Sequence, residues 1–433
     1  MKKVLVITYY WPPGGGAGVQ RWLKFAKYLR NFDWEPVIYT AKNGEMPVID
    51  GSLEKDIPKN TIILKTKIWE PYNIYKFFIG RIKNDKINAS FLSETKKTSL
   101  KEKLSVWIRG NFFIPDARKF WIKPSISYLK NYLQQNKIDV IVSSGPPHSM
   151  HLIALGLKKE FPNIKWIADF RDPWTNIDFY NELKLSKSSD KKHKALELKV
   201  LENADVILCI GNEMKEDFKK IYRKQTEKFK VITNGYDEED VFKGTLEKDK
   251  KFSIAHIGTL VKSRNPEVLW KVLKELINEN AGFKNELEIK LVGKIDINVI
   301  ESIATYGLKD FVKKINYLPH NEVIKEQQKT KVLLLLVNQT KNAKGILTGK
   351  VFEYFAASVP ILAIGPVDGD LAHIIKTTES GIISDFNDSE NLKKNILELF
   401  AGKKMNFKTE EIKKYSRLAL TKKLSELLNS LTN

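Results

Sequence analysis

Cysteine, histidine and long apolar runs are scarce in this sequence. One cysteine, Cys209, stands among 433 residues, so no disulfide can form within the chain and a reducing compartment is expected. No run of about 18 apolar residues occurs, which excludes a membrane-spanning helix. The six histidines form no group with metal-ligand spacing, so no metal site is predicted. The first residues, MKKVLVITYYWPPGGG, lack a full signal-peptide core, which favours a cytoplasmic protein.

The remaining composition is that of a globular protein with a strong positive charge. Hydrophobic residues make up 42% and charged residues 29%, and the length suggests two domains. The net charge of +21 predicts an anionic partner, which can be nucleic acid, anionic lipid or a phosphorylated substrate. A lysine-rich composition inherited from an AT-rich genome is the alternative explanation.

Apolar, β-branched runs alternate with helical periodicity in two series, which predicts two doubly wound parallel sheets. The strands expected in the first series are 3–9, 36–40, 61–64, 140–143, 164–169, 206–210 and 231–232. Those expected in the second are 253–257, 288–292, 312–317, 332–337, 361–364 and 381–384.

The predicted domain boundary lies at a polar, lysine- and acid-rich stretch, 237–251. We expect an N-terminal Rossmann-like domain over 1–236 and a C-terminal one over 237–405. Residues 406–433 contain an amphipathic helix, which we expect to pack back toward the N-terminal domain.

The first series carries a glycine-rich loop, Trp11–Gly16, after its first strand. Position 19 is Val, so the loop is no dinucleotide fingerprint, and no Gly-Lys-Ser/Thr follows, so it is no P-loop. Its amides at Gly15 and Gly16 can still approach a substrate, and a tight turn without a ligand is the alternative.

Polar residues follow two later strands of the first series. His148 comes after the turn at 144–147, and Asp169 and Asp172 follow strand 164–169. Ligands of open parallel sheets bind at such carboxyl ends, so we expect these three residues to act in catalysis. A histidine that merely caps the next helix is the alternative for His148.

The second series has a phosphate-type arrangement at its first strand end. Gly258 and Thr259 are followed by two cations, Lys262 and Arg264, before a helix. Small residues, cations and a helix N-terminus together favour a phosphate group.

A Lys-x-x-Glu pair opens a later helix of the second series. Lys350 and Glu353 share one helix face, and Gly349 precedes them. The lysine can bind a phosphate and the glutamate can accept two ribose hydroxyls. A surface helix with a salt bridge is the alternative.

Between the two predicted halves of the first sheet, residues 65–130 break the pattern. This segment has fifteen Lys and Arg, five Asp and Glu, and twelve aromatic residues. Basic and aromatic residues together indicate contact with an anionic membrane surface, most sharply at 72–83. The alternatives are an ordinary insertion whose aromatics fill a core, and single-stranded nucleic-acid binding, for which no module is recognised.

Five motifs together resemble the GT-B glycosyltransferases of the large family 4, or group 1, type. They are the glycine-rich first loop, Asn234-Gly235-Tyr236-Asp237, Gly258-Thr259-Leu260, Leu291-Val292-Gly293 and KVFEYFAASVPILA at 350–363. The resemblance covers the chain apart from 65–130. It implies an α/β, GT-B fold with two Rossmann-like domains facing a cleft.

The resemblance also implies roles for individual residues. Glu353 matches the second glutamate of the family's E-x7-E motif, whereas the first falls on Gly345. The family's arginine after the phosphate-loop glycine is Thr259 here, and its next lysine matches Arg264. The implied diphosphate clamp is therefore Arg264 with Lys262 or Lys350. His148 falls near the family's histidine beside the donor sugar.

The implied function is transfer of a sugar from a nucleoside-diphosphate sugar to a hydroxyl acceptor. We expect retention of configuration, no metal or other cofactor, and a saccharide or lipid-linked acceptor at the inner membrane face. The pathway expected is cell-surface polysaccharide or glycolipid synthesis, without nucleic acid. The alternatives are a nucleotide-sugar 2-epimerase of the same fold and a non-catalytic nucleotide-sugar-binding protein.

Overall fold

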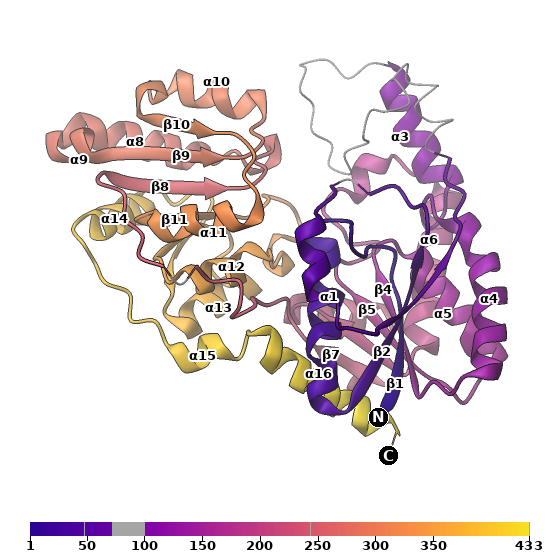
Figure 1. The fold of residues 1–433 in the computed structure, drawn as a ribbon. Coiled ribbons are helices and arrows are strands. Elements are labelled where there is room, and N and C mark those ends of the chain that lie inside the picture. Colours follow the sequence, from indigo (N-terminus) through magenta and orange to yellow (C-terminus); the bar gives the residue numbers. More distant parts are fainter. Residues whose placement is uncertain (47, 72–99, 243, 433) are drawn as a thin grey trace. The chain divides into compact units, whose positions relative to one another are not determined.

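The computed structural model describes residues 1–46, 48–71, 100–242 and 244–432, and these form two compact units (Figure 1). Among the described residues, unit 1 holds 1–234 and 417–432, and unit 2 holds 235–416. The segment 72–83, from which membrane contact was predicted most sharply, lies outside the described residues.

Unit 1 is built on a seven-stranded parallel sheet in the order β3-β2-β1-β4-β5-β6-β7. Its strands are β1 (Lys2–Ile7), β2 (Trp34–Ala41), β3 (Ile62–Thr66), β4 (Val140–Gly145), β5 (Lys165–Phe170), β6 (Val206–Cys209) and β7 (Phe229–Val231). Its helices are α1 (Ala17–Leu29), α3 (Leu100–Phe112), α4 (Ile122–Gln135), α5 (Ser149–Glu160), α6 (Lys187–Asn203), α7 (Asn212–Ile221) and α16 (Arg417–Thr432).

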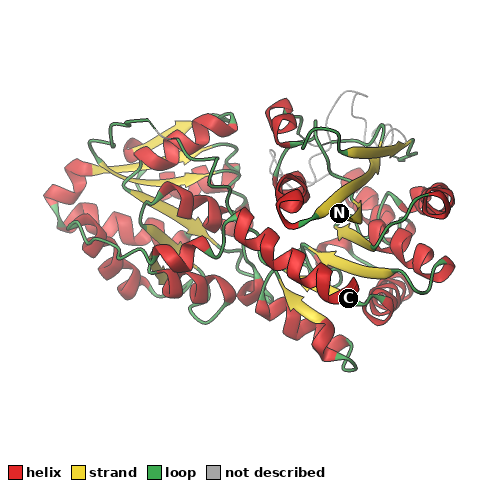
Figure 2. Cartoon of the chain, turned by 60° about the horizontal axis from the view of Figure 1, so that its bottom comes forward, coloured by secondary structure: helices red, strands yellow, loops and turns green. Residues whose placement is uncertain are grey.

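The strands of unit 1 are apolar on both faces because helices cover both faces (Figure 2). Alternate residues of one strand point to opposite sides. On β1, Val4 and Val6 pack in the core under α1 and α16, while Leu5 and Ile7 pack under α4, α5 and α6.

Unit 2 is built on a six-stranded parallel sheet in the order β10-β9-β8-β11-β12-β13. Its strands are β8 (Phe252–Ile257), β9 (Leu287–Val292), β10 (Val312–Ile315), β11 (Val332–Leu336), β12 (Ile361–Ile364) and β13 (Gly381–Ser384). Its helices are α8 (Glu267–Glu279), α9 (Ala281–Glu286), α10 (Ile297–Thr305), α11 (His320–Lys329), α12 (Lys350–Ala357), α13 (Asp370–Thr378), α14 (Ser389–Phe400) and α15 (Thr409–Lys413).

Two cores lie on the two faces of the sheet of unit 2. Leu334 of β11 packs in the core formed with α8, α9, α10 and α14, and Leu333 and Leu335 pack in the core formed with α12, α13 and α15. The central strands β8, β11 and β12 are buried along their whole length and appear in the sequence as short, mostly apolar runs, whereas the edge strand β10, VKKI, is partly exposed.

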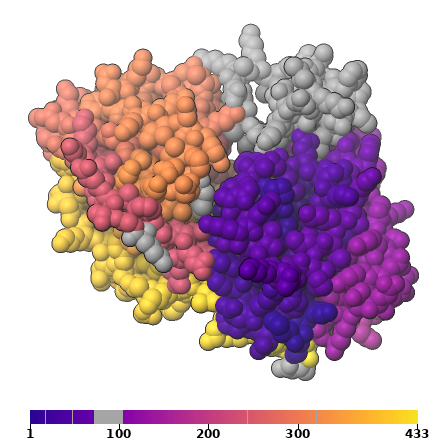
Figure 3. Space-filling model, in the orientation of Figure 1, coloured from indigo at the N-terminus to yellow at the C-terminus, as the bar shows by residue number. Residues whose placement is uncertain are grey.

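The C-terminal helix α16 belongs to unit 1, although the chain reaches it from unit 2. Leu420, Leu424 and Leu428 of α16 are buried in the core beside α1. At the chain's two ends, Lys2 Nζ donates to Thr432 Oγ1 at 2.8 Å. In the space-filling view the C-terminal residues of this unit (yellow) therefore lie against N-terminal residues (indigo) (Figure 3).

Both ends of the segment 65–130 belong to the core of unit 1 rather than to an insertion. β3 extends to Thr66, and α4 packs against α5. Trp121 is 1% exposed, stacks on Tyr39 at 5.0 Å between ring centroids, and donates from Nε1 to Thr66 Oγ1. The sequence pattern missed this because exposed lysines, such as Lys65, Lys67 and Lys123, stand beside these core residues.

Candidate functional site

Two glycines bring the carboxyl ends of β8 and β9 together in unit 2. Gly258 has a φ of 118° and Gly293 a φ of 111°, which residues with side chains rarely adopt. The Gly258 amide donates to Val292 O at 2.7 Å, and a Cβ on Gly293 would lie 3.0 Å from Gly258 O. The close packing of these strand ends therefore requires glycine at both positions.

Lys350, the first residue of α12, lies over the end of β8. A Cβ on Gly258 would lie 2.8 Å from Lys350 Nζ, so the missing side chain provides the space for the ammonium. Nζ also lies 3.3 Å from Nε2 of His256 on β8. β8 and β11 are the neighbours at which the strand order reverses, the usual ligand position in open α/β sheets. The structure thus brings together the predicted residues Gly258 and Lys350.

Arg264 belongs to the same cationic group. It ends the short 3₁₀ turn after β8, and its Nε donates to the side-chain oxygen of Asn338, two residues beyond β11. Burial and then the charge of Arg264 lower the pKa of Lys350 to about 8, while Glu353 opposes the shift. Two cations held close together at strand ends favour binding of an anion.

The other predicted residues of unit 2 flank this group. Glu353 lies one helical turn after Lys350 and is partly buried. Thr259 directly follows Gly258, and Lys262 is exposed on the 3₁₀ turn that ends at Arg264. The structure therefore brings all six predicted donor-site residues of unit 2 to one end of its sheet.

The backbone amides at the start of α12 are already used in the turn that begins the helix. Val351 N donates to Thr348 O at 3.3 Å, and Phe352 N donates to Gly349 O at 3.2 Å. Lys350 N lies 3.4 Å from Thr348 Oγ1. Anion binding here consequently relies on the side chains more than on the helix N-terminus that the sequence suggested.

Gly345, where the family carries its first motif glutamate, ends a 3₁₀ turn in unit 2. The backbone of this turn packs on a glycine, because a Cβ on Gly369 would lie 2.7 Å from Lys344 O. Lys344 itself pairs with Asp368 at 2.5 Å. This turn therefore packs locally around glycine at the position where the family carries its first motif glutamate.

In unit 1, Asp169 is fully buried at the end of β5 and held in an ion pair. It accepts hydrogen bonds from Arg21, Trp22 Nε1 and Ser144 Oγ. Burial raises the pKa of Asp169, but the charge and hydrogen bonds of Arg21, together with the hydrogen bonds of Trp22 and Ser144, outweigh burial and hold the pKa below its usual value. The predicted catalytic role of Asp169 stays a prediction, and its contacts are those of a structural ion pair.

Arg21 extends this buried network to the residues of unit 1 that directly precede unit 2 in the chain. Its guanidinium donates to Ile232 O at 2.9 Å and Thr233 O at 2.7 Å, in addition to Asp169. The network therefore ties α1 and β5 to the segment that follows β7.

His148 stands at the N-cap position of α5, where its side chain makes no capping hydrogen bond, and its ring lies against aromatic side chains. Its ring stacks on Trp174 at 4.6 Å between centroids, and it is 8% exposed. Burial and then the nearby His151 hold the pKa of His148 well below its usual value, so it is neutral at pH 7. A neutral imidazole beside an aromatic ring can donate or accept a hydrogen bond to a sugar hydroxyl.

The remaining predicted residues of unit 1 differ in what they offer. The Gly15 amide already donates to Val48 O at 2.9 Å, whereas a Cβ on Gly16 would meet nothing within 4 Å. The residue Asp172 is exposed as a whole, but desolvation of its carboxylate raises its pKa to about 6, against the opposing charge of Arg171. Arg171 donates to Gly18 O and to Pro146 O. Of the two loop glycines, Gly16 is the better placed to face a ligand, because the Gly15 amide is already used and the space around Gly16 is open.

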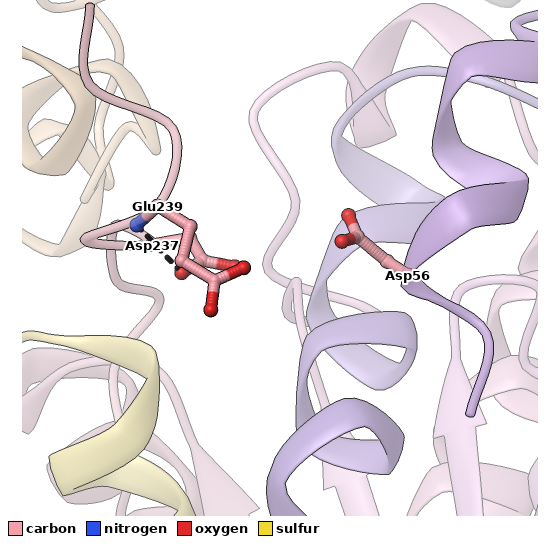
Figure 4. Close-up of side chains that lie close together, drawn as sticks. All are labelled: Asp56, Asp237 and Glu239. Carbon is pink, nitrogen blue, oxygen red and sulfur yellow. Dashed lines mark hydrogen bonds between the residues drawn. The ribbon is translucent and has the colours of Figure 1, made fainter. Parts of the chain in front are cut away.

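Of the three acidic residues drawn in Figure 4, the carboxylates of Asp237 and Asp56 have partners inside their own units. In unit 2 the Glu239 amide donates to Asp237 Oδ1 at 3.1 Å. In unit 1 Asp56 pairs with Lys24 at 2.9 Å and with Lys27 at 3.2 Å. We assign no metal site to these residues.

Sequence reasoning missed three residues that build these sites, namely His256, Asn338 and Arg21. His256 carried a signal, because it is the one basic residue in the apolar strand FSIAHI and stands two residues before Gly258. Asn338 follows a predicted strand end, as binding residues often do. Arg21 carried no local signal, because its partner Asp169 is 148 residues away.

Two family models match this chain. Residues 87–240 match the model described as Glycosyltransferase Family 4, and residues 237–418 match the one described as Glycosyl transferases group 1. Both models are of glycosyltransferases, so the epimerase alternative is not favoured. No curated protein sequence matches the chain.

Solved structures show the same fold at low sequence identity. A glycosyltransferase from Rickettsia africae is 13% identical with a TM-score of 0.64, covering 99% of this chain and 98% of its own. Anabaena HepE, solved with UDP and glucose, is 12% identical with a TM-score of 0.60, covering 99% and 100%. TarM of S. aureus, solved as a mutant with fondaparinux, alpha-GlcNAc-glycerol and UDP, is 13% identical with a TM-score of 0.61, covering 99% and 100%.

With two glycosyltransferase models that together span 87–418, and with two Rossmann-like sheets, the chain belongs to the GT-B glycosyltransferases of the family 4, or group 1, type.

Proposed function

We propose that unit 2 binds the diphosphate of a nucleoside-diphosphate sugar with Lys350 and Arg264, and that the enzyme transfers the sugar to a hydroxyl acceptor. The observation that carries this proposal is the position of Lys350 Nζ over Gly258, beside Arg264, at the point where the strand order reverses. Two solved structures of this fold contain UDP, which supports a nucleoside diphosphate as the ligand class.

Glu353 would bind the ribose of the donor. It stands one helical turn from Lys350, so one helix face would present a cation to the diphosphate and a carboxylate to the sugar of the nucleoside. A carboxylate accepts two hydrogen bonds readily, which suits the two neighbouring hydroxyls of a ribose.

The chemical problem in this reaction is the negative charge that develops on the leaving diphosphate. Lys350 and Arg264 would stabilise that charge as preorganised cations. Such electrostatic stabilisation of the transition state is the largest contribution to the rate enhancement in many enzymes. The proposal is that they do so without a divalent metal. Resemblance to the family favours retention of configuration, and we propose that His148 and Asp172 of unit 1 contact the transferring sugar or the acceptor.

The test is release of nucleoside diphosphate from a panel of donors, with and without EDTA. Wild-type enzyme should release it from one donor class in both conditions. Lys350→Met should lower the rate about a hundredfold or more, as for loss of a group that stabilises transition-state charge. Lys344→Met is the matched control, because Lys344 is an exposed lysine of the same segment, paired with Asp368. Equal rates in the two variants would overturn the role proposed for Lys350. Loss of activity with EDTA would overturn the proposal that no divalent metal is needed.

We propose further that unit 1 contacts an anionic membrane surface where a lipid-linked acceptor is presented, as in cell-surface polysaccharide or glycolipid synthesis. Among the described residues of the segment 65–130, five aromatic side chains are exposed, and they are Trp69, Trp107, Phe112, Phe120 and Tyr128. Lys119 Nζ lies 5.0 Å from the centroid of the Phe120 ring. Basic and aromatic side chains together bind the headgroup region of anionic membranes. No helix in the described part of the chain is long and apolar enough to cross a bilayer.

Sedimentation with vesicles tests this contact. Wild-type protein should sediment with phosphatidylglycerol-containing vesicles and not with phosphatidylcholine alone. Phe112→Ser combined with Phe120→Ser should weaken this sedimentation. The control is Tyr317→Ser, because Tyr317 is an exposed aromatic residue of unit 2. Equal sedimentation with both lipids would remove the proposal.

A further inference from the structure

His256 is a buried polar side chain in the most central part of unit 2. It lies on β8, between β9 and β11, and is 1% exposed. Its neighbours in the strand are apolar or small. A polar group buried in such surroundings is unfavourable unless it has a hydrogen-bond partner. The side-chain partner in this structure is Lys350, whose Nζ lies 3.3 Å from Nε2, and the backbone of Thr259 and Leu334 also acts on the ring.

The direction of this hydrogen bond follows from the chemistry of the two groups. A lysine ammonium has three donors and no acceptor, so His256 Nε2 must be the acceptor. The imidazole is then neutral and carries its proton on Nδ1, which makes no hydrogen bond of good geometry with the described residues, although the backbone of Thr259 and Leu334 acts on the ring. The same ammonium fills the space beside Gly258, where a Cβ would lie 2.8 Å away. His256 therefore fixes where the ammonium lies relative to the strand end.

Neutrality of His256 is maintained by its surroundings. Burial is the main cause, followed by the charges of Lys350 and Arg264, and together they hold the pKa of His256 well below its usual value. Protonation would place a third cation in this group. The groups that act on Lys350 in turn are Arg264 from the 3₁₀ turn, Glu353 from its own helix and His256 from β8.

We propose that His256 is a positioning residue of the donor site, which accepts a hydrogen bond from Lys350 and holds its ammonium over Gly258 for the diphosphate. This inference rests on the proposed function for the identity of the ligand, whereas the contact with Lys350 does not. His256 itself would not touch the donor. Its effect on binding would act entirely through Lys350.

The first test is titration of the Lys350 side chain in the ligand-free protein, followed by NMR of labelled lysine. His256→Leu removes the acceptor, so the ammonium loses a hydrogen bond and the pKa of Lys350 should fall. His256→Gln places an amide oxygen near the position of Nε2 and should keep the pKa close to that of the wild type. His256→Asn, with the same amide on a shorter side chain, replaces the leucine variant if that variant does not fold. An unchanged Lys350 pKa in His256→Leu or His256→Asn would overturn the proposal.

The second test is a double-mutant cycle on the affinity for UDP, GDP and ADP. His256→Leu should weaken binding about tenfold, as for loss of a hydrogen bond to a charged group. In a Lys350→Met background the same change should have almost no further effect, because His256 acts through Lys350. Additive effects of the two changes would overturn the proposal.

The two tests also separate this inference from the proposed function. Absence of binding by any nucleotide in the wild type contradicts the proposed function, whereas the titration of Lys350 still decides the role of His256.

Discussion

Asp169 is the residue of unit 1 whose contacts most clearly indicate a structural role. Its carboxylate is fully buried and accepts hydrogen bonds from Arg21, Trp22 and Ser144. Asp169→Asn would leave the Arg21 guanidinium buried without a counter-charge, which costs about 3–5 kcal/mol in buried pairs. Urea unfolding followed by tryptophan fluorescence is suited to this measurement, because Trp270 is the one tryptophan of nine that lies in unit 2.

Asp172→Asn is the control for this prediction, because Asp172 is exposed three residues away. Desolvation raises the pKa of Asp172 to about 6, so its charge does not stabilise the fold, and Asp172→Asn should be no less stable than the wild type, within about 0.5 kcal/mol. If Asp172 acts in catalysis as predicted, this variant should lose activity without losing stability. A stability of Asp169→Asn close to that of the wild type would contradict the structural role assigned to Asp169.

Lys350 predicts a pH dependence of donor binding. Its pKa is lowered to about 8, by burial and then by Arg264. Below pH 8 the side chain is already charged, and above pH 8 a bound diphosphate must draw a proton onto it. The donor Kd should therefore rise above pH 8, approaching about tenfold per pH unit for one coupled proton. Affinity measured by calorimetry between pH 7 and pH 9 checks this.

Lys350→Arg is the control for this dependence, because arginine stays protonated throughout that range. The variant should bind the donor with little change in Kd between pH 7 and pH 9. The same rise in Kd with pH in Lys350→Arg would show that another group, or the ligand itself, is titrating.

Helix α16 shows how one element far along the chain completes the core of unit 1. Leu424 is fully buried beside α1, whereas Leu418 of the same helix is 39% exposed. Leu424→Ala should lower the stability of unit 1 by about 2–5 kcal/mol, through lost burial and a cavity. Leu418→Ala should have little effect. Equal losses in the two variants, measured by the same tryptophan signal, would contradict the packing of α16.

At the scale of elements, strands were predicted well from the sequence, and their ends less well. All thirteen strands of the described residues overlap the predicted runs, because the central parallel strands are short apolar runs, although the edge strands β3 and β10 are partly exposed and contain lysines. Strand β10, expected over 312–317, ends at Ile315. The order of the strands and the side-chain contacts depend on residues distant in sequence, such as Arg21 and Asp169, and local patterns do not contain that information.

At the scale of the whole molecule, the family assignment and the strong positive charge do not depend on each other. The family 4 type was predicted from five short motifs and is confirmed by the family models. The charge of +21 is spread over the whole chain. The cations that matter for the proposed chemistry are only Lys350 and Arg264, because their positions at the end of β8 are fixed by Gly258, His256 and Asn338.

The measurement that tests the central claim most directly is thermal unfolding with a panel of nucleoside-diphosphate sugars, comparing wild type with Lys350→Met and Glu353→Ala. A donor at about 100 times its Kd should stabilise the wild type by ~2.7 kcal/mol, and this gain should be lost in both variants but kept in Lys344→Met. If no donor stabilises the wild type, or if both variants keep the full gain, the donor site is not where we place it.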